Sequence, residues 1–184
     1  VLPSVITIPS DGQASPYPSQ IAVSGLPAPI LDLNVQLIGL SHGFTPDLDI
    51  VLAGPEGQTV LLMSDVGTAG AVVNINLTLD DEAAQSLPAG DPIADGTYQP
   101  TNYAGGDTMP GLTDPFGSAL SVFDGLSPNG TWSLYVLDDA IADSGTLNSW
   151  TLQFTIDIGI TNQSYTENAP PVANLGSWWV GDVD

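Results

Sequence analysis

Aspartate is the residue type with the clearest chemical potential in this chain, because it recurs in closely spaced sets. A first set holds Asp47, Asp49, Asp65, Asp80 and Asp81, and a second holds Asp138, Asp139 and Asp143. Asp47 and Asp49 are two residues apart at the start of a predicted strand, so their side chains should share a face. Calcium takes six to eight oxygen ligands, which acidic loops meeting at one end of a fold could supply. We therefore predict calcium as a cofactor, although neither set has the spacing of an EF-hand loop.

The composition is consistent with a calcium protein and leaves one alternative open. The chain of 184 residues carries 21 acidic side chains, 18 of them Asp, and no Lys or Arg, for a formal net charge of −21. Either cations come from solution, or the acids form a solvated surface that keeps copies apart by repulsion. The same charge repels DNA and anionic lipid, so we expect no nucleic-acid partner. No apolar run reaches about 18 residues, so we expect no membrane insertion.

The motifs that could indicate an enzyme lack the context that catalysis needs. Residues 39–43 match the G-x-S-x-G elbow of serine hydrolases, in which a strand leads into the nucleophile and a helix leaves it. Here the motif precedes the strand-like DLDIVLAG, and His42 is next to Ser41 rather than later in the chain, where it could act as the base. Carboxylate pairs could serve a glycosidase, but no aromatic platform is interleaved with them. We expect no enzyme activity, and a hydrogen-bonded structural role for His42.

Short apolar runs separated by turn residues predict an all-β fold. In residues 30–38 and 150–158 apolar and polar side chains alternate with the period of two of a half-buried strand. Further predicted strands cover residues 5–8, 20–23, 49–53, 59–63, 72–79 and 132–137. Eight strands with long Gly/Pro/Asp-rich loops favour a jelly-roll-like antiparallel β-sandwich. Residues 80–86 could form one helical turn, and residues 87–119 should be a loop that is functional or pinned by ligands.

The end of the chain has a different pattern from the rest. We expect a sandwich over residues 1–160 and an extended C-terminal tail or linker over residues 161–184. Pro170 and Pro171 should stiffen the tail, and Trp178 and Trp179 beyond them would be costly to leave exposed, so they should dock on this domain or on another chain. Because a sandwich has open strand edges, we predict a homo-oligomer or homopolymer in which this tail docks on a neighbouring subunit.

Three motifs follow one another along the chain: DLDIVLAGPEG from Asp47, PNGTWSL over residues 128–134 and GTLNSWTL over residues 145–152. Together they resemble the P-domain, or homo B domain, that follows the catalytic domain of kexin and furin, in its bacterial form. LSH, LLMSD, Asp80-Asp81 and GTYQPTNY agree with the bacterial branch. The resemblance implies a jelly-roll β-sandwich without catalytic residues, which acts as a stability partner of proteases or as an independent module of surface proteins. This chain contains no protease domain.

Two functions follow as expectations. The first is a non-catalytic, calcium-stabilised extracellular module that is a structural, self-assembling or adhesive surface subunit. The alternative is an accessory, stabilising P-domain of a secreted subtilisin-like serine protease. The first residue, Val1, suggests a processed product, and glycosylation sequons at Asn76, Asn129 and Asn162 are compatible with export to the cell surface or medium.

Overall fold

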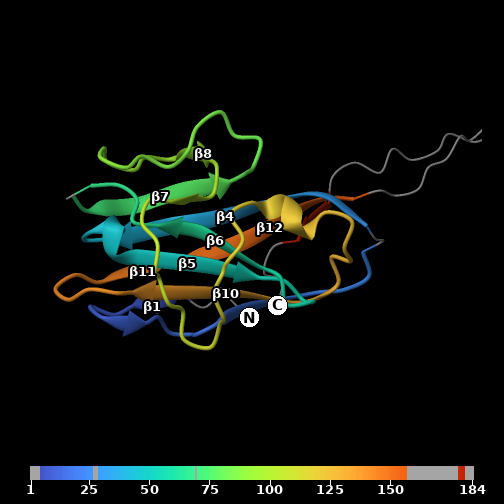
Figure 1. Ribbon diagram of the computed structural model, residues 1–184, viewed down its shortest axis with the longest axis horizontal. Helices are drawn as coiled ribbons and strands as arrows, with labels where there is room; N and C mark the ends of the chain where they lie inside the picture. The colour runs from blue at the N-terminus through green and yellow to red at the C-terminus, as the bar shows by residue number, and fades with distance from the viewer. Residues whose placement is uncertain (1–4, 27–28, 69, 157–177, 181–184) are drawn as a thin grey trace, which may run out of the picture.

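The fold is a sandwich of two β-sheets, seen in a computed structural model that describes residues 5–26, 29–68, 70–156 and 178–180. The chain alternates between the sheets, and their inner faces enclose one core (Figure 1). Two short 3-10 helices, η1 (Thr45–Asp47) and η2 (Leu120–Phe123), connect strands. The predicted all-β sandwich is therefore confirmed. Within the described ranges, no helix is long and apolar enough to cross a bilayer.

The first sheet is built on one long strand that has neighbours along both sides. This strand, β4, pairs with β11 and β12 on one side and with β7 on the other, and β13 is added beyond β12. All pairs are antiparallel except β7 with β8. The strands are β1 (Ile6–Ile8), β4 (Ile30–His42), β7 (Val72–Leu79), β8 (Gly96–Tyr98), β11 (Gly145–Leu147), β12 (Ser149–Ile156) and β13 (Trp178–Val180).

The second sheet is centred on β10 and β5. β10 pairs with β2 and β3 along one side and with β5 along the other, and β6 and β9 follow beyond β5. The β6–β9 pair is parallel and the others are antiparallel. Its strands are β2 (Gly12–Gln13), β3 (Ser19–Val23), β5 (Leu48–Ala53), β6 (Thr59–Ser64), β9 (Thr101–Asn102) and β10 (Gly130–Asp138).

The inner faces of both sheets meet around Trp132. This indole is fully buried, its ring centroid lies 4.9 Å from that of Phe123 and 5.4 Å from that of Phe154, and its Nε1 donates to the Pro128 carbonyl at 2.8 Å. Gly130, two residues earlier, has φ +132° and lies against Pro55, where a Cβ would collide with the proline ring. The PNGTWSL segment thus packs the start of β10 against the turn between β5 and β6.

A second, smaller core lies on the outer face of the β5–β6–β10 sheet. Residues 103–117, here called the covering loop, place Met109 over Val51 and Leu61, with Leu112 and Phe116 packed alongside. Tyr17 donates its hydroxyl to the Pro110 carbonyl at 2.8 Å. Figure 1 shows this loop, in yellow-green, crossing in front of β5 and β10. The loop is therefore held by apolar contacts of its own, and this explains why β5 is buried on both faces.

The structure corrects two details of the sequence prediction. The segment over residues 87–119 contains two short strands, β8 and β9, whose parallel pairing over three and two residues is too brief to leave a period in the sequence. Residues 80–86 form turns rather than a helical turn. The reason is local, since Asp80 Oδ1 accepts from the Glu82 amide at 2.8 Å, a side-chain bond that competes with helical hydrogen bonding.

Candidate functional site

The strand ends near His42 bring a histidine and an aspartate together inside the molecule. His42 ends β4 in one sheet and Asp138 ends β10 in the other, and both are buried. His42 Nε2 lies 3.0 Å from Asp138 Oδ2, and the other carboxylate oxygen accepts from the Ala140 amide at 3.2 Å. His42 Nδ1 is within hydrogen-bond distance of the backbone of Phe44. The predicted structural role of His42 is thus confirmed. The hydrogen bond between His42 and Asp138 connects one sheet to the other.

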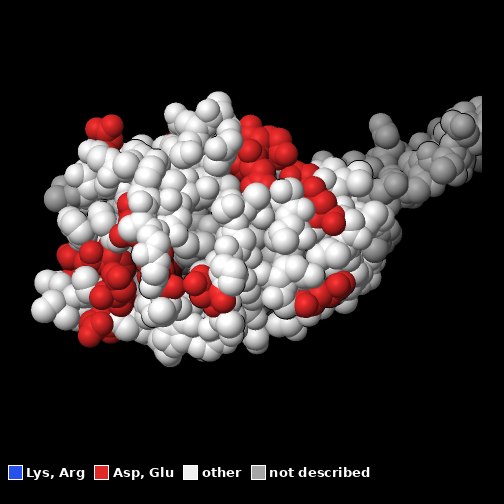
Figure 2. Space-filling model, in the orientation of Figure 1, with Lys and Arg blue, Asp and Glu red and all other residues white. Residues whose placement is uncertain are grey.

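Most of the predicted metal-binding acids gather around this pair at the same end of the sandwich. We call this group the acidic end; it comprises Asp47, Asp49, Asp65, Asp107, Asp139 and Asp143. The charges of Asp138, Asp139 and Asp143 raise the pKa of Asp47, and those of Asp65 and Asp107 raise the pKa of Asp139, after the larger effect of desolvation in each case. In Figure 2 acidic atoms crowd the end where the β10–β11 turn lies, and no basic atom is visible.

Asp49 is the most perturbed member of the acidic end. Asp49 is only 3% exposed, because the covering loop lies over the outer face of β5. Burial raises the pKa of Asp49 to about 7, and the charges of Asp107, Asp139 and Asp65 add to the increase. A hydrogen bond with the Ser64 hydroxyl opposes the increase. The same hydroxyl lies 3.1 Å from Asp65 Oδ2, and its single proton can serve one of the two carboxylates at a time. A cation near Asp49 would favour the ionised carboxylate and so lower this pKa.

Asp49 should make the stability of the metal-free protein fall as the pH rises. Between its ordinary value of 3.8 and about 7, the folded carboxyl retains a proton that the unfolded chain has released. The folded state therefore binds more protons, and the free energy of unfolding decreases across this window and levels off above it. We expect the melting temperature in chelator to fall from pH 5 to pH 7, and Asp49→Asn to reduce that slope. Glu56→Gln, at an exposed turn, is the control; equal slopes in all three proteins would contradict the assignment.

Asp80 and Asp81 do not belong to the acidic end, contrary to the grouping expected from the sequence. They follow β7, whose last residue Leu79 is opposite Val35 of β4, seven residues before His42 at the end of that strand. At about 3.3 Å per residue, roughly 23 Å of strand separate Val35 from His42. Asp80 and Asp81 instead join Asp32 and Asp124, whose pKa values are raised mainly by desolvation and then by these neighbouring charges.

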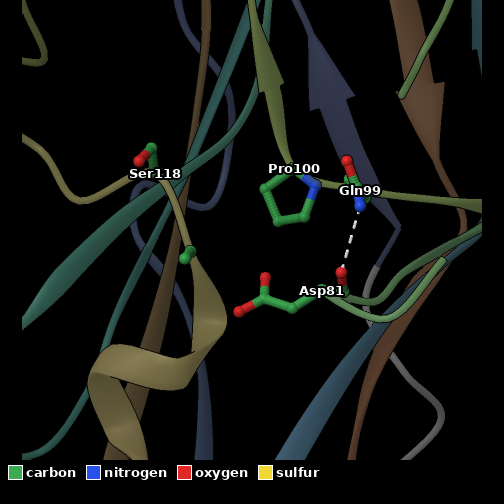
Figure 3. A pocket seen from close by; sticks show the side chains of 5 residues that line it. Asp81, Gln99, Pro100 and Ser118 are labelled. Carbon is green, nitrogen blue, oxygen red and sulfur yellow. Dashed lines mark hydrogen bonds between the residues drawn. The ribbon is translucent and has the colours of Figure 1, made fainter. Parts of the chain in front are cut away.

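The two carboxylate oxygens of Asp81 are already used by the backbone. Oδ1 accepts from the Leu120 amide at 2.9 Å and Oδ2 from the Ser121 amide at 2.8 Å, so Asp81 holds the start of η2. Beside it is a shallow pocket of about 240 Å³, lined by Asp81, Gln99, Pro100, Ser118 and Ala119. Figure 3 shows Gln99 donating to the Asp81 carbonyl, at 3.2 Å. With one carboxylate that is fully engaged, this pocket has no acid–base pair for catalysis.

The G-x-S-x-G segment lies at the end of a strand, with Gly39 to His42 inside β4 and Gly43 just after it. Ser41 lies within β4, and its Oγ accepts from the Asn74 amide at 2.8 Å. His42, the next residue, bonds to Asp138 instead of to Ser41. Gly39 has φ +69° at an irregularity in the β4–β7 register, where a Cβ would collide with Asn148. The glycine thus serves strand packing, and the residues do not form a nucleophile and base.

The acidic end offers carboxylate oxygens of the kind that calcium binds, but they do not form a complete coordination shell. Within the described part of the chain, no three His, Cys, Asp or Glu side chains are placed closely enough to hold a metal ion. Asp138 has both oxygens engaged, which leaves Asp47, Asp49, Asp65, Asp139 and Asp143 as the donors suited to a cation. Asp107 has no signal in the sequence, because only the folding of the covering loop brings it to this end, where Asn102 donates to its Oδ2 at 3.3 Å.

Comparison with known families supports the sequence resemblance over part of the chain. The family model of the proprotein convertase P-domain matches residues 101–154, from β9 to near the end of β12. The matched segment contains both PNGTWSL and GTLNSWTL, so the P-domain resemblance is confirmed over these residues. No curated protein matches the chain.

Proposed function

We propose that this chain is a non-catalytic accessory domain that stabilises a secreted subtilisin-like serine protease. The observation that carries the proposal is the P-domain match over residues 101–154, which coincides with the strands that close the sandwich core. P-domains are accessory domains of secreted proteases. A rigid sandwich can support a catalytic domain by offering it a preformed surface, without contributing reacting groups.

The side chains described above agree with a supporting role. Ser41 bonds to backbone, His42 is committed to Asp138, and the chain has no Cys or Lys that could act as a nucleophile. The proposed location is extracellular, in keeping with the secreted proteases to which P-domains belong. Glycosylation there would suit Asn76, which is exposed, better than Asn129, whose side chain binds both backbone groups of Leu26. Asn162 lies outside the described residues.

A domain-replacement experiment tests the accessory function. The catalytic domain of a subtilisin-like protease that needs its own P-domain would be produced with this chain in the place of that P-domain. We expect active, soluble protease, and loss of that activity with Trp132→Ala, because opening a cavity at a buried Trp costs about 3–5 kcal/mol and unfolds the support. An exposed substitution, Glu56→Gln, is the matched control and should retain activity. A fusion that contains a folded sandwich but no active protease would contradict the proposal.

We further propose that calcium stabilises the acidic end. The support is that several carboxylates are held near one another, with raised pKa values, in a chain without a single Lys or Arg. Asp65, Asp107 and Asp139 come from three different segments, so a shared cation would tie together β6, the covering loop and the β10–β11 turn. Backbone carbonyls and water would complete the six to eight ligands that calcium takes.

A second candidate function is a structural surface subunit that self-assembles or adheres. The observation that favours it is the pairing of the C-terminal strand β13 with the edge strand β12. An added strand at a sheet edge is the geometry by which extended segments join protein subunits. This candidate differs from the first in needing a second copy of the chain rather than a protease.

A further inference from the structure

The edge of the first sheet at β12 is covered by a segment from the far end of the chain. β13 pairs antiparallel with β12, with Leu152 opposite Val180, Gln153 opposite Trp179 and Phe154 opposite Trp178. On its other side β12 pairs with β4, so β13 supplies the partners for the backbone groups that point outward at residues 152–154. Unpaired groups on such an edge are a template for pairing with another chain.

The covering strand is short and is separated from β12 by a long stretch of chain. β13 has three residues, and 21 residues lie between Ile156 and Trp178. A chain of that length can reach up to about 70 Å when extended, more than the width of a small domain. Since every copy has the same strand and the same edge, the strand can pair with its own sheet or with a neighbour's through identical hydrogen bonds, as in domain swapping.

The charges of the chain are arranged so that this contact avoids acid-to-acid repulsion. The net charge of −21 opposes association of two copies. Residues 149–156 of β12, SWTLQFTI, and residues 178–180 of β13, WWV, contain no acidic side chain. The remaining repulsion acts over longer distances and is screened by salt, with a Debye length of about 8 Å at physiological ionic strength. The β12 edge is thus suited to a second copy of an acidic protein.

We propose that residues 178–180 of one copy occupy the β12 edge of a second copy, so that the chains are joined by strand exchange. This inference rests on the second candidate function. The occupied surface is the outward edge of Leu152–Phe154, and the partner is the C-terminal strand of an identical chain. Repetition of the same head-to-tail contact produces an open polymer, and reciprocal exchange produces a closed dimer.

Cysteine trapping tests the exchange directly, because the chain has no cysteine of its own. Gln153→Cys and Trp179→Cys are placed at opposed positions, where the Cα separation of an antiparallel pair suits a disulfide. The two single variants, one carrying a size tag, would be mixed unfolded, refolded together at high protein concentration in salt, and then oxidised. We expect a disulfide between the two different chains. Thr131→Cys, an exposed position on β10 in the other sheet, replaces Gln153→Cys as the control and should give none.

Truncation gives a second measurement that introduces no substitution into β12 or β13. A chain ending at Ser177 lacks β13, whereas one ending at Val180 keeps it and loses only residues 181–184. We expect light scattering to show association of the full chain and of the chain ending at Val180, and a monomer for the chain ending at Ser177.

Three results would overturn the inference. One is the absence of a mixed disulfide while a double variant, carrying both cysteines in one chain, forms it internally. Another is equal association of the two truncated chains, which would leave self-assembly standing but place it on another surface. A full-length chain that stays monomeric at high concentration in calcium and salt would remove both the exchange and the second candidate function.

Discussion

Asp138→Ala is expected to lower the free energy of unfolding by several kcal/mol, because each buried donor that loses its acceptor costs about 1–3 kcal/mol. The substitution would remove the hydrogen-bond partner of His42 Nε2, which lies 3.0 Å from the carboxylate. It would also leave the Ala140 amide without its acceptor. His42 and Asp138 are both buried, so water cannot readily replace the hydrogen bond between them. The measurement is denaturant unfolding in excess chelator, which separates this effect from metal binding.

Two neighbouring substitutions make this prediction specific. Asp139→Ala removes an exposed carboxylate one residue away, and surface changes of this kind typically alter stability by no more than about 0.5 kcal/mol. Asp138→Asn keeps the shape of the side chain and an acceptor oxygen, so its loss should be smaller than that of Asp138→Ala. Similar losses for Asp138→Ala and Asp139→Ala would show that the His42–Asp138 contact does not hold the two sheets together.

Chelation is expected to remove about 2.7 kcal/mol of stability from a protein held at a calcium concentration one hundred times its dissociation constant. The physical reason is that a cation would offset both the burial of these carboxyls and their mutual repulsion. Burial is the larger cause of the raised pKa values of Asp47, Asp49 and Asp139, and the neighbouring acids add to it. Thermal unfolding with calcium and with excess chelator measures the difference. Calorimetric titration of calcium into the metal-free protein gives the dissociation constant.

Matched variants show whether the acidic end is the place where calcium binds. Asp65→Asn should reduce the calcium-dependent part of the stability, because it removes a ligand charge from the acidic end. Glu56→Gln removes the same charge from the exposed turn between β5 and β6 and should leave that part unchanged. If the melting temperature is the same in calcium and in chelator, the alternative of a simply solvated acidic surface is correct.

The strand predictions succeeded where the pattern was local. Residues 30–38 and 150–158 alternate in polarity, and the structure has strands at Ile30–His42 and Ser149–Ile156. The eight predicted strands all have counterparts, because an inward-facing apolar residue at every second position is the direct result of burying one face of a sheet. The short parallel strands β8 and β9 were missed because two or three residues cannot establish that period.

The sequence predicted which residue type forms the candidate site, but not which of the aspartates lie close together. The sequence shows that Asp is abundant and that Lys and Arg are absent, and hence that the acids find no Lys or Arg partner within the chain. It placed Asp80 and Asp81 with Asp47, whereas β7 runs antiparallel to β4 and carries them toward the opposite end from His42. Asp138, Asp139 and Asp143, expected as a separate set, lie beside Asp47 because β10 and β5 are neighbours in one sheet.

Composition and period by themselves therefore determined the all-β class, the positions of eight strands and the surplus of negative charge. Tertiary structure alone decided that Asp138 meets His42 in the interior, that the covering loop buries Asp49 and delivers Asp107, and that β13 covers the β12 edge. The reason is that periodicity records the environment of each residue along one strand. Which strands are neighbours depends on contacts between residues far apart in the chain. Forming such contacts costs loop-closure entropy, and this cost is recovered only when the whole core is buried.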